Sequence, residues 1–364
     1  MNISHTRMLS TLAIVSGLVL LELLATGCQK QAQTVLSQSQ AKSQAFPANT
    51  DFERGIVYPR WQPSAYGSAD STWQDGIKTI RVQTAARWLE IPILFAQDTS
   101  ASTKVGQSQS TPSVLSFISG IQMAHDQGYK VFFVPLMSVH EKNGWSGSIT
   151  LPTDVKQKAW FDSYWSTLSP YIEAAQENKV EQMAIGTELQ IIQKQVPALY
   201  WKQLVTRIRS VFKQSLTYDM NWSSLSDTVP DWFKNSDLAM IGVSSYVPLT
   251  DTPEQIDAKK IPQLWQQKVL SQLDSLSTQI GKKVLISEIG YRNTSDALYH
   301  TWLSKSTAPT DMVVQAEAFD AVLANTYADA HIAGTFFWGW DDVDMFMIKG
   351  RPAAQILHKW YSLH

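Results

Sequence analysis

Short apolar segments alternate with segments of helical pattern along most of this chain, and no other feature constrains its fold as strongly. Such alternation is typical of successive β-α units around a parallel sheet, and eight units can be counted. The expected strands are residues 54–58, 89–95, 130–137, 182–186, 216–220, 238–243, 284–287 and 332–337. The expected helices are residues 68–83, 112–125, 154–177, 197–213, 253–280, 312–329 and 352–361. The sequence therefore predicts an α/β fold, a (β/α)8 TIM barrel that forms a single domain.

The first 27 residues have the pattern of a processing signal rather than of a folded element. Basic residues precede an apolar run from Met8 to Leu24, and Leu24-Ala25-Thr26-Gly27-Cys28 resembles a bacterial lipobox. Cleavage before Cys28 would leave the chain's only cysteine to carry lipid. Gln29 follows it, instead of the Asp that usually retains a lipoprotein at the inner membrane, so we expect a lipid anchor at Cys28 in the bacterial outer membrane. An ordinary secretory signal or an uncleaved anchor is the alternative interpretation.

Residues 28–50 are rich in Gln, Ser, Ala and Lys and contain almost no large apolar residue. Such a segment buries too little surface to offset the entropy lost on ordering, so we expect a flexible tether. Residues 51–364 are then the barrel domain, and we expect it to be a monomer.

The composition excludes one class of partner and favours another. The net charge is -2 and only 17% of residues are charged, so no basic stripe for nucleic acid is expected. The chain has 14 Trp, well above ordinary usage. Flat apolar faces in this number suit either a thick core or a cleft that stacks on sugar rings.

Two glutamates follow predicted strands, Glu188 after the fourth and Glu288 after the seventh. A carboxylate at the carboxyl end of a barrel strand lies at the mouth, where substrates bind. Retaining glycosidases need two such carboxyls on either side of the scissile bond. We expect Glu188 to be the proton donor, with a raised pKa, and Glu288 to stay ionised as the nucleophile. The alternative is that one of them is a rim residue paired with an arginine such as Arg292.

Polar and aromatic residues end other strands at the same predicted mouth. Asn221 and Trp222 follow the fifth strand, Tyr246 the sixth, and Trp338 and Trp340 the eighth. A tyrosine can hold the carboxylate of a nucleophile, and tryptophan can stack on the apolar face of a sugar. We therefore expect these residues to contact substrate, although each tryptophan could instead pack in the core.

No metal site or cofactor site is expected. Asp341, Asp342 and Asp344 follow the eighth strand, but rim carboxylates are more often solvated and their spacing matches no calcium loop. The histidines are scattered without the spacing of a zinc site, and no phosphate loop or dinucleotide motif occurs.

Ordered motifs run from Phe52 to His364 and together resemble a known family. They are Arg54-Gly55-Ile56, Gln97-Asp98 with Thr111-Pro112, Trp145-Ser146-Gly147-Ser148-Ile149, Ala159-Trp160-Phe161-Asp162-Ser163-Tyr164, Ile185-Gly186-Thr187-Glu188-Leu189, Leu216-Thr217-Tyr218 with Asn221-Trp222, Ser287-Glu288-Ile289-Gly290-Tyr291-Arg292, Phe337-Trp338-Gly339-Trp340 and Lys349-Gly350-Arg351-Pro352-Ala353. This set is similar to glycoside hydrolase family 113, whose members are retaining β-mannanases with a (β/α)8 barrel.

The resemblance implies roles that spacing only suggests. Glu188 would be the acid/base, Glu288 the nucleophile, and Trp145 in the loop after the third strand a contact to the carbohydrate substrate. Arg87 stands where the family pattern predicts Asn, and Leu136 where it predicts His. Both positions therefore predict altered contacts to the sugar nearest the cleavage point. The same residues would also suit a glycan-binding lipoprotein that does not hydrolyse, or a transglycosylase that acts on an envelope glycan.

Overall fold

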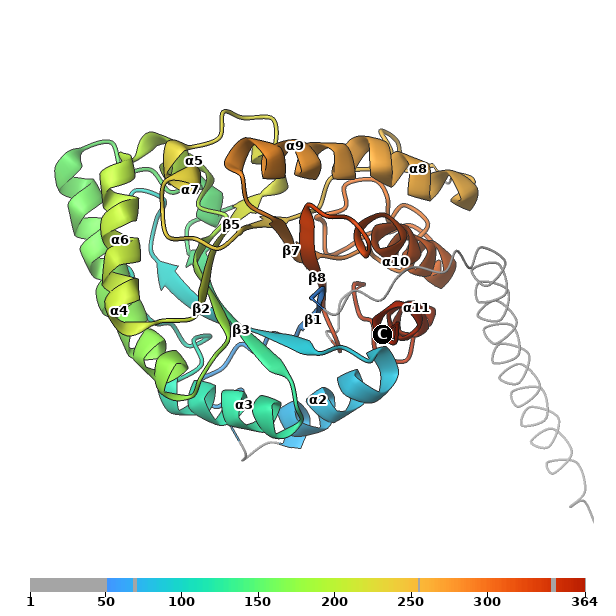
Figure 1. Ribbon diagram of the computed structural model, residues 1–364, viewed down its shortest axis with the longest axis horizontal. Coiled ribbons are helices and arrows are strands. Elements are labelled where there is room, and N and C mark those ends of the chain that lie inside the picture. Colours follow the sequence, from blue (N-terminus) through green and yellow to red (C-terminus); the bar gives the residue numbers. More distant parts are fainter. Residues whose placement is uncertain (1–50, 68–70, 255, 342–344, 364) are drawn as a thin grey trace, which may run out of the picture. The chain divides into compact units, whose positions relative to one another are not determined.

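Eight parallel strands close into a barrel in chain order, as the alternation of apolar and helical segments predicts (Figure 1). The computed structural model describes residues 51–67, 71–254, 256–341 and 345–363. The predicted signal, the lipid site Cys28 and the tether lie outside the described residues. The strands are β1 (Glu53–Val57), β2 (Trp88–Gln97), β3 (Lys130–Val139), β4 (Gln182–Thr187), β5 (Ser215–Asn221), β6 (Ile241–Ser244), β7 (Val284–Ile289) and β8 (Ile332–Trp338).

Helices surround the described barrel on its outside (Figure 1). The longer ones are α2 (Ser71–Thr84), α3 (Val114–Asp126), α4 (Asp154–Glu177), α6 (Ala198–Val211), α9 (Ser271–Ile280), α10 (Met312–Thr326) and α11 (Pro352–Tyr361). Shorter pieces are α5 (Gln190–Gln195), α7 (Asp231–Lys234) and α8 (Ile261–Trp265), the last joined to α9 by a π-helical turn, Gln266–Leu270. Within the described ranges no helix has the length and apolarity needed to cross a membrane.

The helix boundaries follow local signals in the sequence. Ser113 caps α3 because its side chain accepts a hydrogen bond from the backbone N–H of Ser116. Gly128 after α3 has φ of +74°, a left-handed conformation that commonly ends helices. The expected helix 253–280 begins as an α-helix only at Ile261 and contains the π-helical turn, whereas α5 and α7 were not predicted. Both are a turn or two long, too short to show an apolar period.

Closure depends on β1, which pairs with β2 on one side and with β8 on the other. Ile56 lies opposite Leu89 of β2 and opposite Phe337 of β8. A closed barrel leaves no strand edge open to pairing with another chain. Because all strands are parallel, their carboxyl ends meet at one rim, and the loops that follow them form the mouth.

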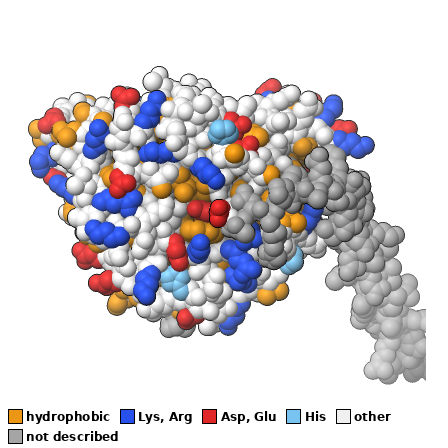
Figure 2. All heavy atoms as spheres, in the orientation of Figure 1, with side chains coloured by type: hydrophobic (Ala, Val, Ile, Leu, Met, Phe, Trp, Pro, Cys, Tyr) orange, Lys and Arg blue, Asp and Glu red, His pale blue; other side chains and the backbone are white. Residues whose placement is uncertain are grey.

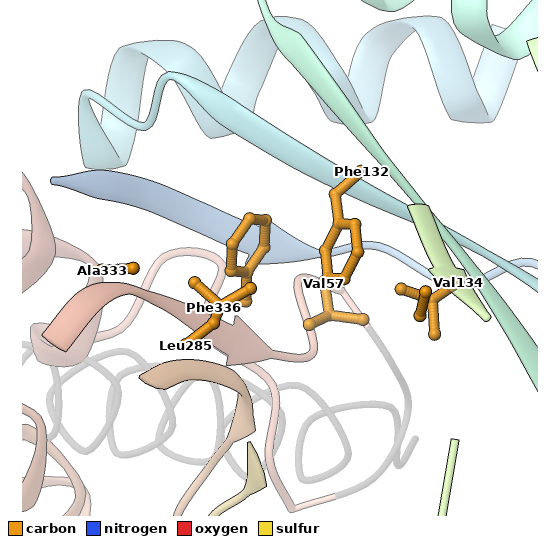
Figure 3. Close-up of a cluster of buried hydrophobic side chains, with 7 residues drawn as sticks. Val57, Phe132, Val134, Leu285, Ala333 and Phe336 are labelled. Carbon is orange, nitrogen blue, oxygen red and sulfur yellow. The ribbon is translucent and has the colours of Figure 1, made fainter. Parts of the chain in front are cut away.

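An apolar cluster fills the barrel interior. Side chains from β1, β3, β7 and β8 converge there, including Val57, Phe132, Leu285 and Phe336, all of which are fully buried (Figure 3). Phe132 and Phe336 pack with ring centroids 5.2 Å apart. The interior is therefore a packed core rather than a pore, so a ligand can bind only above it, at the mouth.

Tryptophans account for much of the rest of the core. Six of them are fully buried, namely Trp73, Trp160, Trp201, Trp232, Trp265 and Trp340. Trp201 and Trp232, for example, stack with centroids 4.4 Å apart. The high tryptophan content thus serves the core in part, and the exposed tryptophans are a separate group.

Charged side chains are distributed over the surface without separation by sign. On the face drawn in Figure 2, acidic and basic side chains are interspersed, with apolar side chains gathered near its middle. The described side chains of that face therefore form no continuous field of one sign.

Closure between β1 and β8 requires a residue without a side chain at position 334. A Cβ on Gly334 would lie 2.4 Å from Cβ of Glu53 and 2.5 Å from its carbonyl oxygen, so β1 and β8 would be forced apart. We expect Gly334→Ala to lower the free energy of unfolding by about 1–3 kcal/mol, measured by urea unfolding.

Gly106→Ala is the matched control, because a Cβ there meets nothing within 4 Å. We expect the free energy of unfolding of that variant to stay within about 0.5 kcal/mol of the parent value. Equal stability of the two variants would show that the close contact of β1 with β8 does not restrict this position.

Candidate active site

The two strand-end glutamates lie at the mouth of the barrel. Glu188 directly follows β4, and Glu288 is the penultimate residue of β7. Glu188 has φ of +53°, a left-handed conformation that is uncommon for a residue with a side chain. Its backbone N–H donates to the carbonyl of Asp219 on β5 at 2.7 Å, which ties this conformation to the neighbouring strand. Strain of this kind is typical of functional sites.

Both glutamates line the same cavity, which has a volume of about 560 Å³. Its lining residues are Trp145, Glu188, Asn221, Trp222, Ser223, Tyr246, Glu288, Trp302, Ser304 and Trp338. They come from loops and strand ends around much of the barrel, after β3, β4, β5, β6, β7 and β8. The size and the mixture of aromatic and polar groups are those of a small-molecule site.

The carboxylate of Glu188 is held by two nitrogen donors. The side-chain amide of Asn221 donates to Oε1 at 2.7 Å, and the indole N–H of Trp145 donates to Oε2 at 3.2 Å. The amide oxygen of Asn221 accepts hydrogen bonds from the backbone N–H and the hydroxyl of Ser223, at 2.9 and 2.7 Å. These contacts fix the orientation of the Asn221 amide, so its NH2 group is the part that faces Glu188.

Glu288 is held differently, by a single hydroxyl and by its surroundings. The Tyr246 hydroxyl donates to Oε1 of Glu288 at 2.6 Å. Burial, with the nearby charge of Glu188, raises the pKa of Glu288 to about 8, although the Tyr246 hydrogen bond lowers it. This raised pKa disagrees with the expectation that Glu288 stays ionised at neutral pH. Two carboxylates in one cavity repel each other, and a proton on Glu288 removes that repulsion.

Two further carboxyls are buried inside the barrel near Glu288, and sequence reasoning missed both. They are Glu90 on β2 and Asp219 on β5. Burial raises the pKa of each well above its usual value, with additional repulsion from Asp219 and Glu288 on Glu90, and from Glu288 on Asp219. Burial therefore favours the neutral form of both carboxyls. Their signal in the sequence was a single acidic residue inside each apolar strand.

Arg292 does not pair with either glutamate in the cavity. Its guanidinium donates instead to carbonyl oxygens of the loop that follows β7, among them those of His300 and Leu303, both at 2.8 Å. The alternative interpretation of a rim glutamate paired with Arg292 is therefore wrong.

The other residues expected at the mouth divide into two groups. Trp145, Asn221, Trp222, Tyr246 and Trp338 all line the cavity. Their contact with substrate stays a prediction.

Trp340 is placed differently, because it is fully buried and does not line the cavity. The chain returns after β8, and the backbone N–H of Lys349 donates to the Trp340 carbonyl at 2.9 Å. The prediction for Trp340 is therefore wrong, since the returning segment places this side chain in the core.

Asp341, the first of the three aspartates after β8, forms an ion pair with Arg60 at 3.0 Å. Asp342 and Asp344 lie outside the described residues.

Three lining residues were not predicted, namely Ser223, Trp302 and Ser304. Trp302 and Ser304 belong to the loop between β7 and α10, and Trp302 is 43% exposed. Trp61 lies next to the cavity, because its ring stacks on that of Trp338 with centroids 6.5 Å apart. In the sequence, the signal for Trp302 and Trp61 was an aromatic residue in a loop that follows a barrel strand.

The two positions that depart from the family pattern lie far apart. Leu136 on β3 is partly buried and packs against the apolar cluster of the barrel interior, as Trp338 does. Arg87 precedes β2, where its backbone N–H donates to Arg54 and its carbonyl accepts from Lys130, both at 2.9 Å. The amino ends of the strands face away from the mouth. The expectation that position 87 alters a contact to the sugar nearest the cleavage point is therefore wrong.

Comparisons with known proteins identify one matching family and several structures of similar fold. Residues 64–355 match the family model for Glycoside Hydrolase Family 113. No curated protein matches the sequence significantly. A GH113 β-1,4-mannanase structure is similar with a TM-score of 0.74 and 19% identity, over 86% of this chain and 100% of that chain. A GH113 β-mannanase from Alicyclobacillus acidocaldarius has a TM-score of 0.71 and 19% identity, over 86% of this chain and 98% of that chain.

A β-glucuronidase from Ruminococcus gnavus is a more distant structural match. It has a TM-score of 0.56 and 9% identity, over 85% of this chain and 49% of that chain. At such identities the likeness of the solved structures concerns the fold alone.

The contacts of Glu288 predict how its carboxyl titrates in variants. Glu188→Gln removes the repelling charge, so the pKa of Glu288 should fall below the value of about 8. Tyr246→Phe removes a donor that favours the charged form, so the pKa should rise. Carbon-13 NMR of labelled glutamate carboxyls measures both shifts, with Glu288→Gln to assign the signal. An unchanged titration in Glu188→Gln would show that the two carboxyls do not interact.

Proposed function

This chain belongs to glycoside hydrolase family 113 and is a glycoside hydrolase, and we propose that it cleaves a β-linked, mannan-type glycan with retention of configuration. The observation that carries the proposal is the cavity shared by Glu188 and Glu288, in which each carboxyl has its own hydrogen-bond donors. Retention needs two carboxyls at one site, one to attack the anomeric carbon and one to transfer a proton.

We assign the nucleophile to Glu288 and the acid/base to Glu188. In the first step a Glu288 oxygen bonds to the anomeric carbon, the bond from that carbon to the leaving oxygen breaks, and the proton of Glu188 moves to the leaving oxygen. In the second step Glu188 takes a proton from water, the water oxygen bonds to the anomeric carbon, and Glu288 is released. The Tyr246 hydroxyl stabilises Glu288 whenever that carboxylate carries charge.

The first step needs an ionised Glu288, yet burial and the charge of Glu188 raise the pKa of Glu288 to about 8. Glu288 must therefore lose its proton before it attacks the anomeric carbon. The hydrogen bond from the Tyr246 hydroxyl lowers the pKa of Glu288 and so favours its ionised form.

The lining of the cavity favours a neutral sugar. Of the ten described residues that line it, two are carboxylates and none is Lys or Arg. A uronic acid would meet repulsion there without a cation to pair with. The tryptophan faces suit the apolar faces of pyranose rings. Since the GH113 structures compared above are those of β-mannanases, β-1,4-mannan is the first substrate to test.

We also propose that the protein acts at the bacterial outer membrane. The lipobox-like segment that ends at Cys28, together with Gln29, supports lipidation and this location. The Gln- and Ser-rich segment before the barrel supports a tether that lets the domain reach glycans away from the lipid surface.

The assigned roles predict different defects in two variants of the full-length chain. Glu288→Gln should have no detectable activity on β-1,4-mannan, because its amide cannot attack the anomeric carbon. Glu188→Gln should lose about 10²–10⁴-fold on mannan but much less on a dinitrophenyl glycoside, whose leaving group needs no proton. Release of reducing sugar measures the first activity, and release of dinitrophenol the second. Proton NMR of the first product should show the β-anomer.

The control is Glu177→Gln, an exposed residue at the end of α4, whose activity should equal that of the parent. Full activity of Glu288→Gln would contradict the assigned roles. Absence of hydrolysis by the parent, with glycan binding intact, would instead favour a glycan-binding protein. Transfer of sugar to another glycan rather than to water would favour a transglycosylase.

The anchor proposal predicts the behaviour of Cys28→Ser in a bacterial host. The parent should incorporate radiolabelled palmitate and fractionate with outer membranes, whereas the variant should do neither, because the thiol is the lipid acceptor. Labelling of the variant, or an unlabelled parent, would contradict lipidation at Cys28.

A further inference from the structure

The loop between β7 and α10, residues 290–311, forms one wall of the cavity without any helix or strand of its own. It contributes Trp302 and Ser304 to the lining. Long loops without secondary structure in compact domains are often binding elements. Such a loop binds a ligand in a defined place only if its conformation is well ordered.

A buried guanidinium holds the loop together from inside. The side chain of Arg292 is 1% exposed and donates to the carbonyls of Asp296, Tyr299, His300 and Leu303 at 2.8–3.0 Å. A buried cation is costly unless it is fully hydrogen-bonded, and the planar fork of arginine can reach several carbonyls at once. These hydrogen bonds restrain the conformation of the loop. Trp302 lies between His300 and Leu303, and Arg292 binds the carbonyls of both.

The carboxylate of Asp296 links distant parts of the loop to one another. Although burial raises the pKa of Asp296, the hydroxyls of Ser306 and Thr294 and the guanidinium of Arg292 together lower it below its usual value. The two hydroxyls donate to its carboxylate at 2.7 and 2.6 Å. The charged form of Asp296 thus links the two ends of the loop to Arg292.

The loop is also tied to the catalytic groups. The hydroxyl of Thr301, a fully buried residue, donates to the backbone carbonyl of Tyr246, whose own hydroxyl donates to Glu288. Trp302 is the next residue in the chain. The position of its ring is therefore set relative to the nucleophile that we propose.

The ring of Trp302 is exposed and paired at the cavity wall. It stacks on Trp222 with centroids 5.4 Å apart and an angle of 28° between the planes. His300 packs near Trp302 as well, with centroids 4.8 Å apart. Trp302 remains 43% exposed beside these contacts and lines the cavity, and exposed aromatic side chains in a cavity are typical of binding surfaces.

We propose that Trp302 and Trp222 form a platform for a sugar unit beyond the one that is cleaved, and that Arg292 is the positioning residue that holds this platform in place. The inference rests on the proposed function, because it names how a glycan chain extends through the same site. A neutral pyranose is the ligand, since the platform offers apolar faces with the hydroxyls of Ser223 and Ser304 beside them.

A second stacked pair lies on another side of the mouth. Trp338 ends β8 and Trp61 follows β1, and β8 and β1 are neighbours in the barrel. Trp222 and Trp302 follow β5 and β7, which are separated from each other only by β6. A chain that contacts both pairs would be bound through more than one sugar.

The platform predicts a defect that depends on chain length in Trp302→Ala. With β-1,4-mannohexaose, KM should rise about tenfold, whereas hydrolysis of a dinitrophenyl β-mannoside should stay within about twofold of the parent, because one sugar does not reach the platform. Trp302→Tyr keeps an aromatic face and should recover most of the loss. Leu303→Ala is the matched control, since its side chain is 44% exposed in the same loop and does not line the cavity.

A double-mutant cycle that combines Arg292→Lys with Trp302→Ala tests the role of Arg292. Lysine keeps the positive charge but lacks the planar fork of hydrogen-bond donors. A positioning role predicts that Arg292→Lys raises KM for mannohexaose and adds little to Trp302→Ala in the double variant. A purely structural role predicts a lower thermal midpoint with the same KM, and additive effects. Circular dichroism checks that each variant is folded.

Failure of the platform and failure of the proposed function are distinguishable. Calorimetry with Glu288→Gln as the parent measures the binding of the β-1,4-linked hexasaccharides of mannose and of glucose without turnover. Weaker binding after Trp302→Ala supports the platform even if the parent hydrolyses nothing. Equal binding with and without Trp302, or no binding of either hexasaccharide, would overturn it.

Discussion

Closure of a parallel barrel is the constraint on which the rest of this structure depends. Because β1 pairs with β8 as well as with β2, the carboxyl ends of all eight strands meet at one rim. Glu188 and Glu288 are distant in the chain, yet closure brings both to one cavity. The apolar cluster inside the barrel prevents any ligand from passing below that rim. Gly334, where an added Cβ would collide with Glu53 of β1, therefore contributes to the site without lying in it.

The second constraint is electrostatic and follows from the first. Two carboxyls in one cavity cannot both be charged at low cost, and burial with the charge of Glu188 raises the pKa of Glu288. The hydrogen-bond donors differ between the two, with Asn221 and Trp145 on Glu188, and Tyr246 on Glu288. Burial also raises the pKa of Glu90 and of Asp219, which favours their neutral forms near the site. The surroundings of each carboxyl thus differ, although both are glutamates at strand ends.

The loops determine which glycan can approach this pair. Trp145, Trp222, Trp302 and Trp338 come from four different loops or strand ends, and their faces line the same cavity. The loop after β7 is held by a buried charged residue, Arg292, whose hydrogen bonds to loop carbonyls stand in for those of a helix or strand. Rigidity here is obtained from buried polar contacts rather than from secondary structure, and a rigid wall loses less entropy when it binds a chain.

The sequence by itself determined the barrel, the order of its strands and the rim positions of Glu188, Glu288, Asn221 and Tyr246, because apolar periods and strand ends are local patterns. Tertiary structure alone decided the rest. Trp338 and Trp340 are two residues apart and equally aromatic, yet one lines the cavity and the other is fully buried. The raised pKa of Glu288 and the network around Arg292 were likewise hidden from the sequence. Burial and charge depend on neighbours that are distant along the chain, and only folding brings those neighbours together.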